Sequence, residues 1–377
     1  MANTFNLDID LDGEGRQDGY LRVKASSEHS PFGMAMVPIT SFKSGAGPCV
    51  LVMGGCHGDE YEGQLIARAL LGKLDLSDVT GQLIVMPSAN PHAVAAGRRY
   101  SPLDDGNLNT AFPGSTTGTS TQRIAHFIET VLLPRADLVI DMHSGGTPVD
   151  YIPSVMISNA VEGARRQRLI ELVRTFGLPV AFFVDDEDQT PSSVIGACDR
   201  TETLNITLEI GGGGSVARDQ LDVGMAGLLR TLEKIGVLNS TSQEEPGDVA
   251  FMRRLPVSAT ICAPESGLFE PIAKLGETVE REQLAGLLYH REAPWREPLR
   301  VVFPEAGLVL CRRLPVMVDM GAGRRCHVNL YCSCLRFGLG VNFGDADTRY
   351  QFQASSFSAT GRCSRSLALP AVQSEPA

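Results

Sequence analysis

Short apolar runs alternate with longer segments of helical periodicity along the first 240 residues. Each run is bounded by glycine, proline or polar residues, which is typical of strands buried in a parallel sheet. The predicted strands lie at 50–54, 81–86, 136–141, 180–184 and 204–210. Apolar residues recur every three or four positions within 65–70, 120–134, 161–176 and 219–235, which predicts helices. This alternation predicts an α/β domain, residues 1–240, with a doubly wound, mainly parallel sheet.

Two parts of this first domain lack such regular patterns. Residues 1 to about 45 are expected to form strands and loops, with a short extended run at 38–40. Residues 88–114 are expected to form a long polar loop, because they are rich in turn-forming residues. Loops of this length inside a compact domain are usually either functional or disordered. The specific turn chemistry and the few flexible repeats favour a functional role for this one.

A smaller β-module is predicted at 247–320, after a linker at 240–246. Segments 263–269 and 275–279 resemble the biotinyl/lipoyl-like β-sandwich. A carrier domain of that type needs an acceptor lysine at a hairpin tip, and residues 295–304 contain none. We therefore expect a structural β-sandwich or barrel that shapes the cleft or forms an oligomer contact.

The last segment, residues 321–377, has a different character. Arginines and cysteines accumulate there without clear periodicity, and the cysteine spacing matches no zinc module. We interpret 321–377 as an atypical, poorly ordered tail, as a change of reading frame near the end of the gene would produce. A flexible extension is the alternative.

Composition and charge limit the kinds of partner. The 377 residues exceed what one apolar core usually holds, which agrees with two domains. The formal net charge of −11 argues against nucleic acid or an anionic membrane as the main partner. The acidic N-terminus has no signal-peptide pattern, and no apolar run is long enough to span a bilayer, so we expect a cytoplasmic protein. In a reducing compartment the nine cysteines are expected to be free thiols. None of them forms a Cys-x-x-Cys pair, which argues against a cysteine zinc ribbon.

A histidine and a glutamate follow the first buried strand. Gly54 and Gly55 end that strand, and His57 and Glu60 come next, before the helix. An imidazole and a carboxylate at this spacing can converge on one metal ion, as two of the three protein ligands of a catalytic zinc site. The alternative is that the two side chains only satisfy each other at a helix start, where acidic residues are favoured.

Two later strands end with similar chemistry. His143 follows the strand at 136–141 and precedes two glycines, so we expect it to be the third ligand at the same edge of the sheet. Asp141 either orients one of the imidazoles or is a buried structural carboxylate. Glu209 stands just before four glycines, where it can face the same cleft.

These motifs together resemble the succinylglutamate desuccinylase/aspartoacylase family, which belongs to the zinc carboxypeptidase superfamily. The resemblance covers roughly residues 10–320 and rests on segments 54–63, 107–109, 141–144 and 208–212. Within the family, segments 97–102, 112–114 and 211–214 are most similar to the N-acetyl-diaminobutyrate deacetylases of ectoine degradation. The resemblance implies a sheet of zinc-carboxypeptidase type with a smaller C-terminal β-domain.

The resemblance also implies roles for individual residues. Three residues are implied as ligands of one Zn²⁺ per chain: His57, Glu60 and His143. Such a site keeps a position for water, lowers the pKa of that water to about 7 and polarises the amide carbonyl. Glu209 is implied as the general base that moves the water proton to the leaving amine. Arg99, or its neighbour Arg98, is implied to face the carbonyl oxygen and stabilise the oxyanion.

One position departs from the family pattern. The family has Asn-x-Asn-Arg before Phe-Pro-Gly, and that Asn-Arg pair holds the substrate carboxylate; here Thr110 stands in place of the arginine. Threonine cannot make the bidentate charged contact of an arginine. Carboxylate recognition is then expected to pass to Asn109 and Arg98, or the substrate differs. The expected substrate-binding residues are Arg98, Asn107, Asn109 and Thr110.

The sequence thus predicts a zinc-dependent enzyme that hydrolyses the amide bond of a small N-acyl amino acid. The resemblance implies deacetylation of Nα-acetyl-L-2,4-diaminobutyrate. Desuccinylase- or aspartoacylase-like activity and carboxypeptidase activity on peptides are the alternatives within this class. An inactive binding protein is the alternative outside it, suggested by Thr110 but opposed by the presence of all four catalytic positions. A homo-oligomer is compatible with the sequence, which does not specify an oligomeric state.

Overall fold

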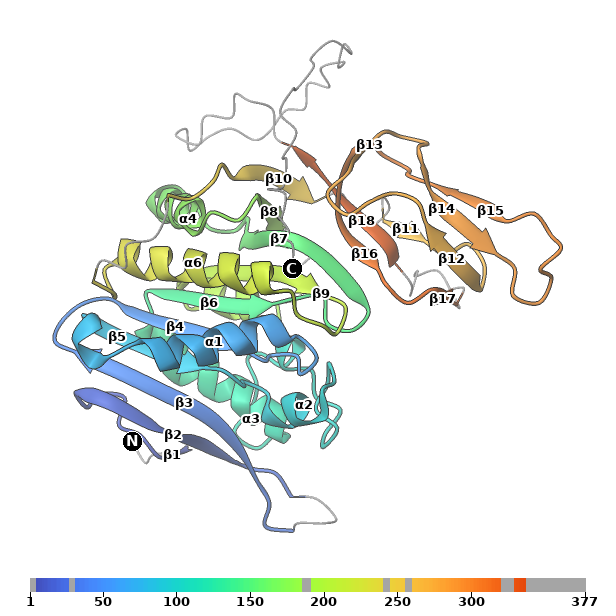
Figure 1. The fold of residues 1–377 in the computed structure, drawn as a ribbon. Coiled ribbons are helices and arrows are strands. Elements are labelled where there is room, and N and C mark those ends of the chain that lie inside the picture. Colours follow the sequence, from blue (N-terminus) through green and yellow to red (C-terminus); the bar gives the residue numbers. More distant parts are fainter. Residues whose placement is uncertain are drawn as a thin grey trace, which may run out of the picture. The chain divides into compact units, whose positions relative to one another are not determined.

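A computed structural model describes residues 5–26, 31–184, 191–239, 245–254, 260–319 and 329–336. Four neighbouring parallel strands form the centre of its large sheet, in the order β5 (Gly81–Met86), β4 (Cys49–Gly54), β6 (Leu138–His143) and β9 (Leu204–Gly212) (Figure 1). Every residue of β4, β5 and β6 is buried. Because both faces of these strands are covered, most of their side chains are apolar on both faces, which explains the apolar runs.

The sheet extends on both sides with mixed strand directions. Beyond β5, the strands β3 (Met34–Ser44), β2 (Gly15–Lys24) and β1 (Asn6–Leu7) follow in antiparallel pairs. Beyond β9, the antiparallel β7 (Val149–Ser158) is followed by β8 (Val180–Val184) and β10 (Ala250–Arg254), each parallel to its neighbour. β2 lies near the outer edge and alternates more and less exposed residues, as a partly solvated strand does.

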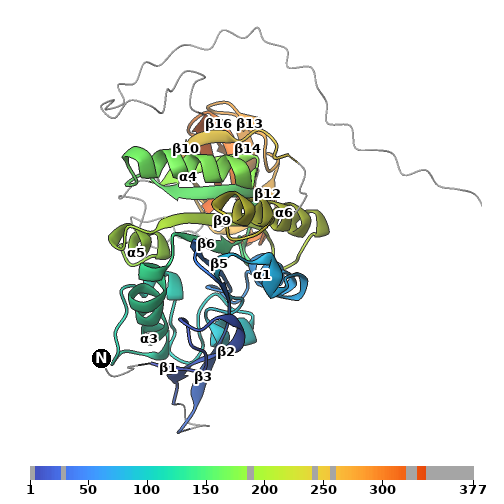
Figure 2. The ribbon, with the colours of Figure 1, turned by 90° about the vertical axis from the view of Figure 1, so that its left-hand side faces the viewer.

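Helices cover both faces of the sheet, which confirms the predicted doubly wound α/β class. Figure 2 shows α1 (Tyr61–Lys73) and α6 (Arg218–Ile235) on one side, and α3 (Ser120–Phe127) and α5 (Val194–Arg200) on the other. α4 (Gly163–Phe176) packs beside α6. α3 begins with a capping box of Thr119 and Gln122, and α6 ends at Gly236 in the left-handed conformation. Among the described helices, none has the length and hydropathy needed to cross a bilayer.

Several elements lie where the sequence predicts none. Strand β7 contains Asp150 and Pro153, which obscure its apolar pattern. The register of its pairing with β9 shifts between Tyr151 and Ser154, and such a bulge tolerates the missing N–H of Pro153. Helix α5 is too short for a helical period to stand out. Within the predicted loop at 88–114 the structure has α2 (Pro91–Ala96) and a 3₁₀ helix at Leu108–Thr110. That segment is therefore more regular than predicted.

A second sheet, antiparallel and four-stranded, lies in the C-terminal region. Its order is β15 (Leu299–Val302), β14 (Leu284–Tyr289), β12 (Gly267–Pro271) and β17 (Met317–Val318). One face of this sheet contributes to a separate apolar core that includes Phe269, Leu288 and Phe303. Strands β11 (Ile261–Cys262), β13 (Thr278–Val279) and β16 (Gly307–Arg313) complete that region. β16 also pairs with β7, so backbone hydrogen bonds join it to the large sheet.

One strand falls inside the predicted irregular tail. β18 (Asn329–Arg336) pairs with β10, β11 and β16. Pairing with neighbouring strands on both sides supports a strand whose own side-chain pattern is weak. The other residues of 321–377 lie outside the described residues. β10 belongs to the large sheet although 250–254 falls in the predicted C-terminal module. The domain boundaries at 240, 247 and 320 stay predictions.

The first turn of α1 lies directly against the ends of β4 and β6. A Cβ atom at Gly63 would be 2.5 Å from the Met142 carbonyl oxygen, and one at Gly54 would be 2.7 Å from the Gly63 carbonyl oxygen. Only glycine permits backbones to approach this closely. The contact brings the residues before α1 to the carboxyl end of β6, where His143 stands.

We predict opposite effects for two glycine substitutions in α1. Gly63→Ala should destabilise the protein by about 1–3 kcal/mol, because the new methyl group meets the β6 backbone. Gly72→Ala is the matched control: among the described residues, no atom outside the helix's own backbone lies within 4 Å of its Cβ position, so alanine should stabilise the protein by about 0.5–1 kcal/mol. Urea unfolding measures both values. An equal gain in stability for both variants would contradict the close contact between α1 and β6.

Candidate active site

The three residues expected to bind zinc lie together at the carboxyl ends of β4 and β6. His57 and Glu60 are in the turn between β4 and α1, and His143 is the last residue of β6. All three are buried, with exposed fractions of 1%, 2% and 3%. One ligand atom from each can be chosen so that all lie within 4.8 Å of one another. This geometry allows the three side chains to bind one ion.

Glu60 is the common partner of both histidines. His57 Nδ1 lies 2.6 Å from Glu60 Oε1, and His143 Nδ1 lies 2.8 Å from Glu60 Oε2. The two ring centroids are 5.1 Å apart. Two imidazole nitrogens and one carboxylate thus converge on a single buried region.

The other nitrogen of each ring faces a fixed oxygen atom. His57 Nε2 lies 3.0 Å from Asn107 Oδ1, and His143 Nε2 lies 2.9 Å from Asp141 Oδ2. Contacts of this kind fix the tautomer and the orientation of metal-binding imidazoles. Of the two roles considered for Asp141, this contact agrees with the orienting one.

The hydrogen bonding of His143 shows why a cation fits between these groups. When Nε2–H donates to Asp141, a neutral ring has only a lone pair on Nδ1, and that lone pair faces the Glu60 carboxylate. Burial lowers the pKa of His143, but the charges of Asp141 and Glu60 raise it well above its usual value, so the surroundings favour a positive charge at this ring. A bound metal ion would supply that charge. Two imidazoles and one carboxylate are a donor set that suits Zn²⁺.

Glu60 itself stays ionised in this buried position. Burial alone raises the pKa of its carboxyl group, but the two neighbouring histidines hold the pKa well below its usual range. The Ser144 backbone N–H also donates to Glu60 Oε2, at 3.3 Å. The lowered pKa favours the carboxylate form of Glu60, whose two oxygens face the two rings.

Glu209 is the neighbour of His143 across the β6–β9 pairing. The residue is partly buried, and its Oε2 atom is shielded from solvent without a hydrogen-bond partner among the described residues. Burial, with a further contribution from the charge of Glu60, raises the pKa of Glu209 to about 8. A cation bound nearby would lower that pKa. A carboxyl group that titrates close to neutral pH can both accept and release a proton.

The two neighbouring arginines are placed differently. Arg99 Nη1 donates to Glu60 Oε1 at 3.1 Å, and 46% of its side chain is exposed. Arg98 is exposed, and it is its backbone oxygen that accepts a hydrogen bond, from the Gly58 N–H at 2.9 Å. Arg99 is thus the one whose guanidinium reaches the ligand cluster.

The asparagines expected to bind substrate also hold the 107–110 segment in place. Asn107 Oδ1 accepts from the Asn109 backbone N–H at 3.0 Å and faces His57 as well. Asn109 Oδ1 accepts from the Val194 N–H at 3.3 Å. Thr110 is exposed, and its Oγ1 donates back to the Asn107 carbonyl oxygen at 3.3 Å. The structure therefore adds a supporting role for Asn107, toward His57.

The sequence did not reveal the contact between Asp59 and Thr147. Asp59 is buried, and its Oδ2 accepts from the Thr147 backbone N–H at 2.9 Å and from Thr147 Oγ1 at 3.0 Å. These bonds tie the segment after β6 to the turn that holds His57 and Glu60. Asp59 lies between two residues of the 54–63 motif, but no local pattern indicates a partner 88 residues away.

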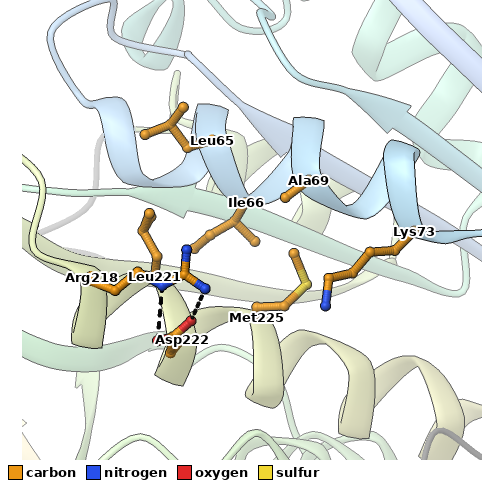
Figure 3. Close-up of a pocket in the computed structure, with 8 residues that line it drawn as sticks. All are labelled: Leu65, Ile66, Ala69, Lys73, Arg218, Leu221, Asp222 and Met225. Carbon is orange, nitrogen blue, oxygen red and sulfur yellow. Dashed lines mark hydrogen bonds and ion pairs between the residues drawn. The ribbon is translucent and has the colours of Figure 1, made fainter.

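A shallow groove between α1 and α6 does not share the chemistry of this site. Figure 3 shows its lining, in which Arg218 and Asp222 form an ion pair. The groove contains neither histidine nor cysteine. Its residues are Leu65, Ile66, Ala69, Lys73, Arg218, Leu221, Asp222 and Met225.

Comparisons with known proteins agree with the geometry. Residues 46–235 match the model of the succinylglutamate desuccinylase/aspartoacylase catalytic domain. The N-alpha-acetyl-L-2,4-diaminobutyric acid deacetylase of Halomonas elongata is 32% identical over 83% of this chain and 91% of its own length.

Solved structures are similar over most of the chain. The product-bound ectoine utilization protein EutE (DoeB) from Ruegeria pomeroyi has a TM-score of 0.82 at 30% identity, covering 89% of this chain and 99% of its own. A succinylglutamate desuccinylase/aspartoacylase from Rhodobacter sphaeroides has a TM-score of 0.80 at 31% identity, with the same coverage. With its fold, its buried ligand cluster and these similarities, the chain belongs to the succinylglutamate desuccinylase/aspartoacylase family.

Proposed function

We propose that this protein is a zinc-dependent hydrolase that removes the acetyl group from Nα-acetyl-L-2,4-diaminobutyrate. One observation carries the hydrolase part of this proposal: both oxygens of the buried Glu60 carboxylate face a histidine Nδ1, from His57 and His143. Glu209, whose Oε2 has no hydrogen-bond partner within the described part of the chain, lies on the strand beside them. The proposed substrate is inferred from the names of the Halomonas and Ruegeria relatives, a diaminobutyric acid deacetylase and an ectoine utilization protein.

His57, Glu60 and His143 would hold one zinc ion per chain. When bound, zinc would polarise the amide carbonyl of the substrate and lower the pKa of a water molecule. Asn107 and Asp141 keep the two rings in the tautomers that direct Nδ1 toward Glu60. Asp59, through Thr147, holds the loop after His143 against the turn that supplies the other two ligands.

Glu209 and Arg99 would perform the proton transfer and the charge stabilisation. The shielded Glu209 carboxylate takes a proton from the attacking water and delivers it to the departing amine, work that typically contributes about 10²–10⁴-fold. Arg99 already points its guanidinium at the ligand cluster, and its exposed half leaves N–H groups for the substrate carbonyl oxygen. Arg98, Asn109 and Thr110 remain the proposed contacts for the substrate carboxylate, at the more exposed side of the site.

We predict that zinc binding depends on His143 and not on histidines elsewhere. The purified chain should contain one zinc ion, and His143→Ala should lose most of it because one of three ligands is gone. His126→Ala is the control, because His126 is in α3 and is not one of the proposed ligands. Its Nδ1 lies 3.3 Å from the Pro113 carbonyl oxygen. Elemental analysis by mass spectrometry measures occupancy. Zinc at the wild-type level in His143→Ala would refute the ligand assignment.

We predict that the zinc-loaded protein cleaves Nα-acetyl-L-2,4-diaminobutyrate with a higher kcat/KM than N-acetylaspartate, N-succinylglutamate or a dipeptide. Glu209→Gln should lower kcat by about 10²–10⁴ while keeping its zinc, because it removes the base and leaves the ligands. Product amine and zinc content are measured on the same samples. A higher kcat/KM for another of these substrates would refute the proposed substrate and leave the proposed hydrolase chemistry intact. Absence of hydrolysis throughout would favour an inactive binding protein, and loss of zinc in Glu209→Gln would make Glu209 a ligand.

A further inference from the structure

The four-stranded C-terminal sheet exposes a row of large apolar side chains. In the pairing of β12 with its two neighbouring strands, Leu268 of β12 lies opposite both Tyr289 of β14 and Met317 of β17. The exposed fractions of these three residues are 38%, 38% and 45%. Val302 of β15, with 38% exposed, lies at the other edge of the same face. We call this surface the outer face. Its residues are Leu268, Glu270, Leu287, Tyr289, Arg300, Val302 and Met317.

The other face of this sheet is already used for packing. Phe269, Leu288, Val301 and Val318 are buried in the C-terminal apolar core, and each is next in sequence to a residue of the outer face. A strand with one face in the core and the other in water normally alternates apolar and polar residues. Here the second face is apolar too, which is the pattern of strands covered on both sides. Contiguous exposed apolar surface of this kind usually marks an interaction site.

Two opposite charges interrupt the outer face in a particular arrangement. Glu270 of β12 and Arg300 of β15 both lie opposite Leu287 of β14, one on each side. Tyr289 donates its hydroxyl proton to Glu270 Oε2 at 2.8 Å, which confirms that both point to this face. Neighbouring strands are about 4.8 Å apart, so the two charges stand on either side of β14 at roughly equal distances.

A two-fold axis along β14 at Leu287 exchanges the positions of these charges. If a second copy packs face to face about that axis, Glu270 of each chain lies over Arg300 of the other, and Leu287 meets its own copy. An isologous dimer requires a surface that is complementary to itself in this way. Strands of the two sheets would run nearly parallel, as in aligned sheet packing.

We propose that the outer face is the interface of a homodimer, in which Glu270 of one protomer pairs with Arg300 of its partner. The apolar row supplies buried area, and the two charge pairs set the alignment of the chains. Trp295, the single tryptophan of the chain, lies in the β14–β15 connection with 82% of its surface exposed. This connection begins after Tyr289, the last residue of β14, so Trp295 is a natural fluorescent reporter of association.

Charge reversal in two separate variants tests this pairing. The symmetric dimer contains two Glu270–Arg300 pairs. Glu270→Arg puts two positive charges together at each pair, and Arg300→Glu puts two negative charges together. Each variant alone should therefore be a monomer near 40.4 kDa. An equimolar mixture should form a heterodimer of twice that mass, because each chain then offers the charge that the other lacks. Size-exclusion chromatography with light scattering measures the masses. Glu280→Arg, an exposed reversal next to β13, is the control and should dimerise like the wild type.

The remaining outcomes separate this dimer from other assemblies. The wild type should be a dimer whose Trp295 emission moves to longer wavelength on dilution, and the double variant Glu270→Arg/Arg300→Glu should dimerise again. Circular dichroism checks that each variant is folded. A monomeric wild type, a dimer that survives both single reversals, or a mixture that stays monomeric would each overturn the proposal. Zinc content and hydrolysis are not readouts here, so the result is independent of the proposed function.

Discussion

The candidate site depends on one buried carboxylate that two imidazoles share. Glu60 has almost no contact with water, and an isolated charge in such a place is strongly unfavourable. His57, His143, Arg99 and the Ser144 N–H surround it and keep it ionised. The same arrangement creates a place for a cation, because the two Nδ1 atoms and the carboxylate all point inward.

The fold brings these groups together by close backbone packing and not by side-chain length. Gly63 lets α1 touch the end of β6, and Gly54 lets β4 end against α1. Glu60 and His143 are 83 residues apart in sequence, yet they meet because β4 and β6 are parallel neighbours with chemistry at the same ends. Asp141, Asn107 and the bond between Asp59 and Thr147 then fix the orientation of each ligand. A change in any of these supports is expected to act on the metal site through its ligands.

The sequence predicts the centre of this fold well because its strands are buried on both faces. β4, β5, β6 and β8 lie at or next to the predicted positions, since continuous apolar runs indicate such strands directly. β7 was not predicted, because Pro153 and Asp150 break its pattern and its pairing depends on β9 and β8. β18 was not predicted either, because its hydrogen bonds come from three distant strands.

The same distinction applies to the candidate site. His57, Glu60, His143 and Glu209 stand at strand ends next to glycines, a local signal, and the structure brings all four together. Sequence alone could not choose between Arg98 and Arg99, because adjacent side chains differ in direction only once the backbone is known. The supporting contact of Asn107 to His57 and that of Asp59 to Thr147 join segments far apart in sequence. No local pattern encodes such pairs.

The most direct test of the account is to locate the metal by anomalous diffraction at the zinc edge, using crystals of the zinc-loaded protein. We expect one peak, bonded to Nδ1 of His57, Nδ1 of His143 and an oxygen of Glu60 at about 2.0–2.2 Å. Asn107 and Asp141 should still contact the Nε2 atoms. A zinc ion bound through Nε2 of either ring, or located away from Glu60, would contradict the central claim that this carboxylate organises the site.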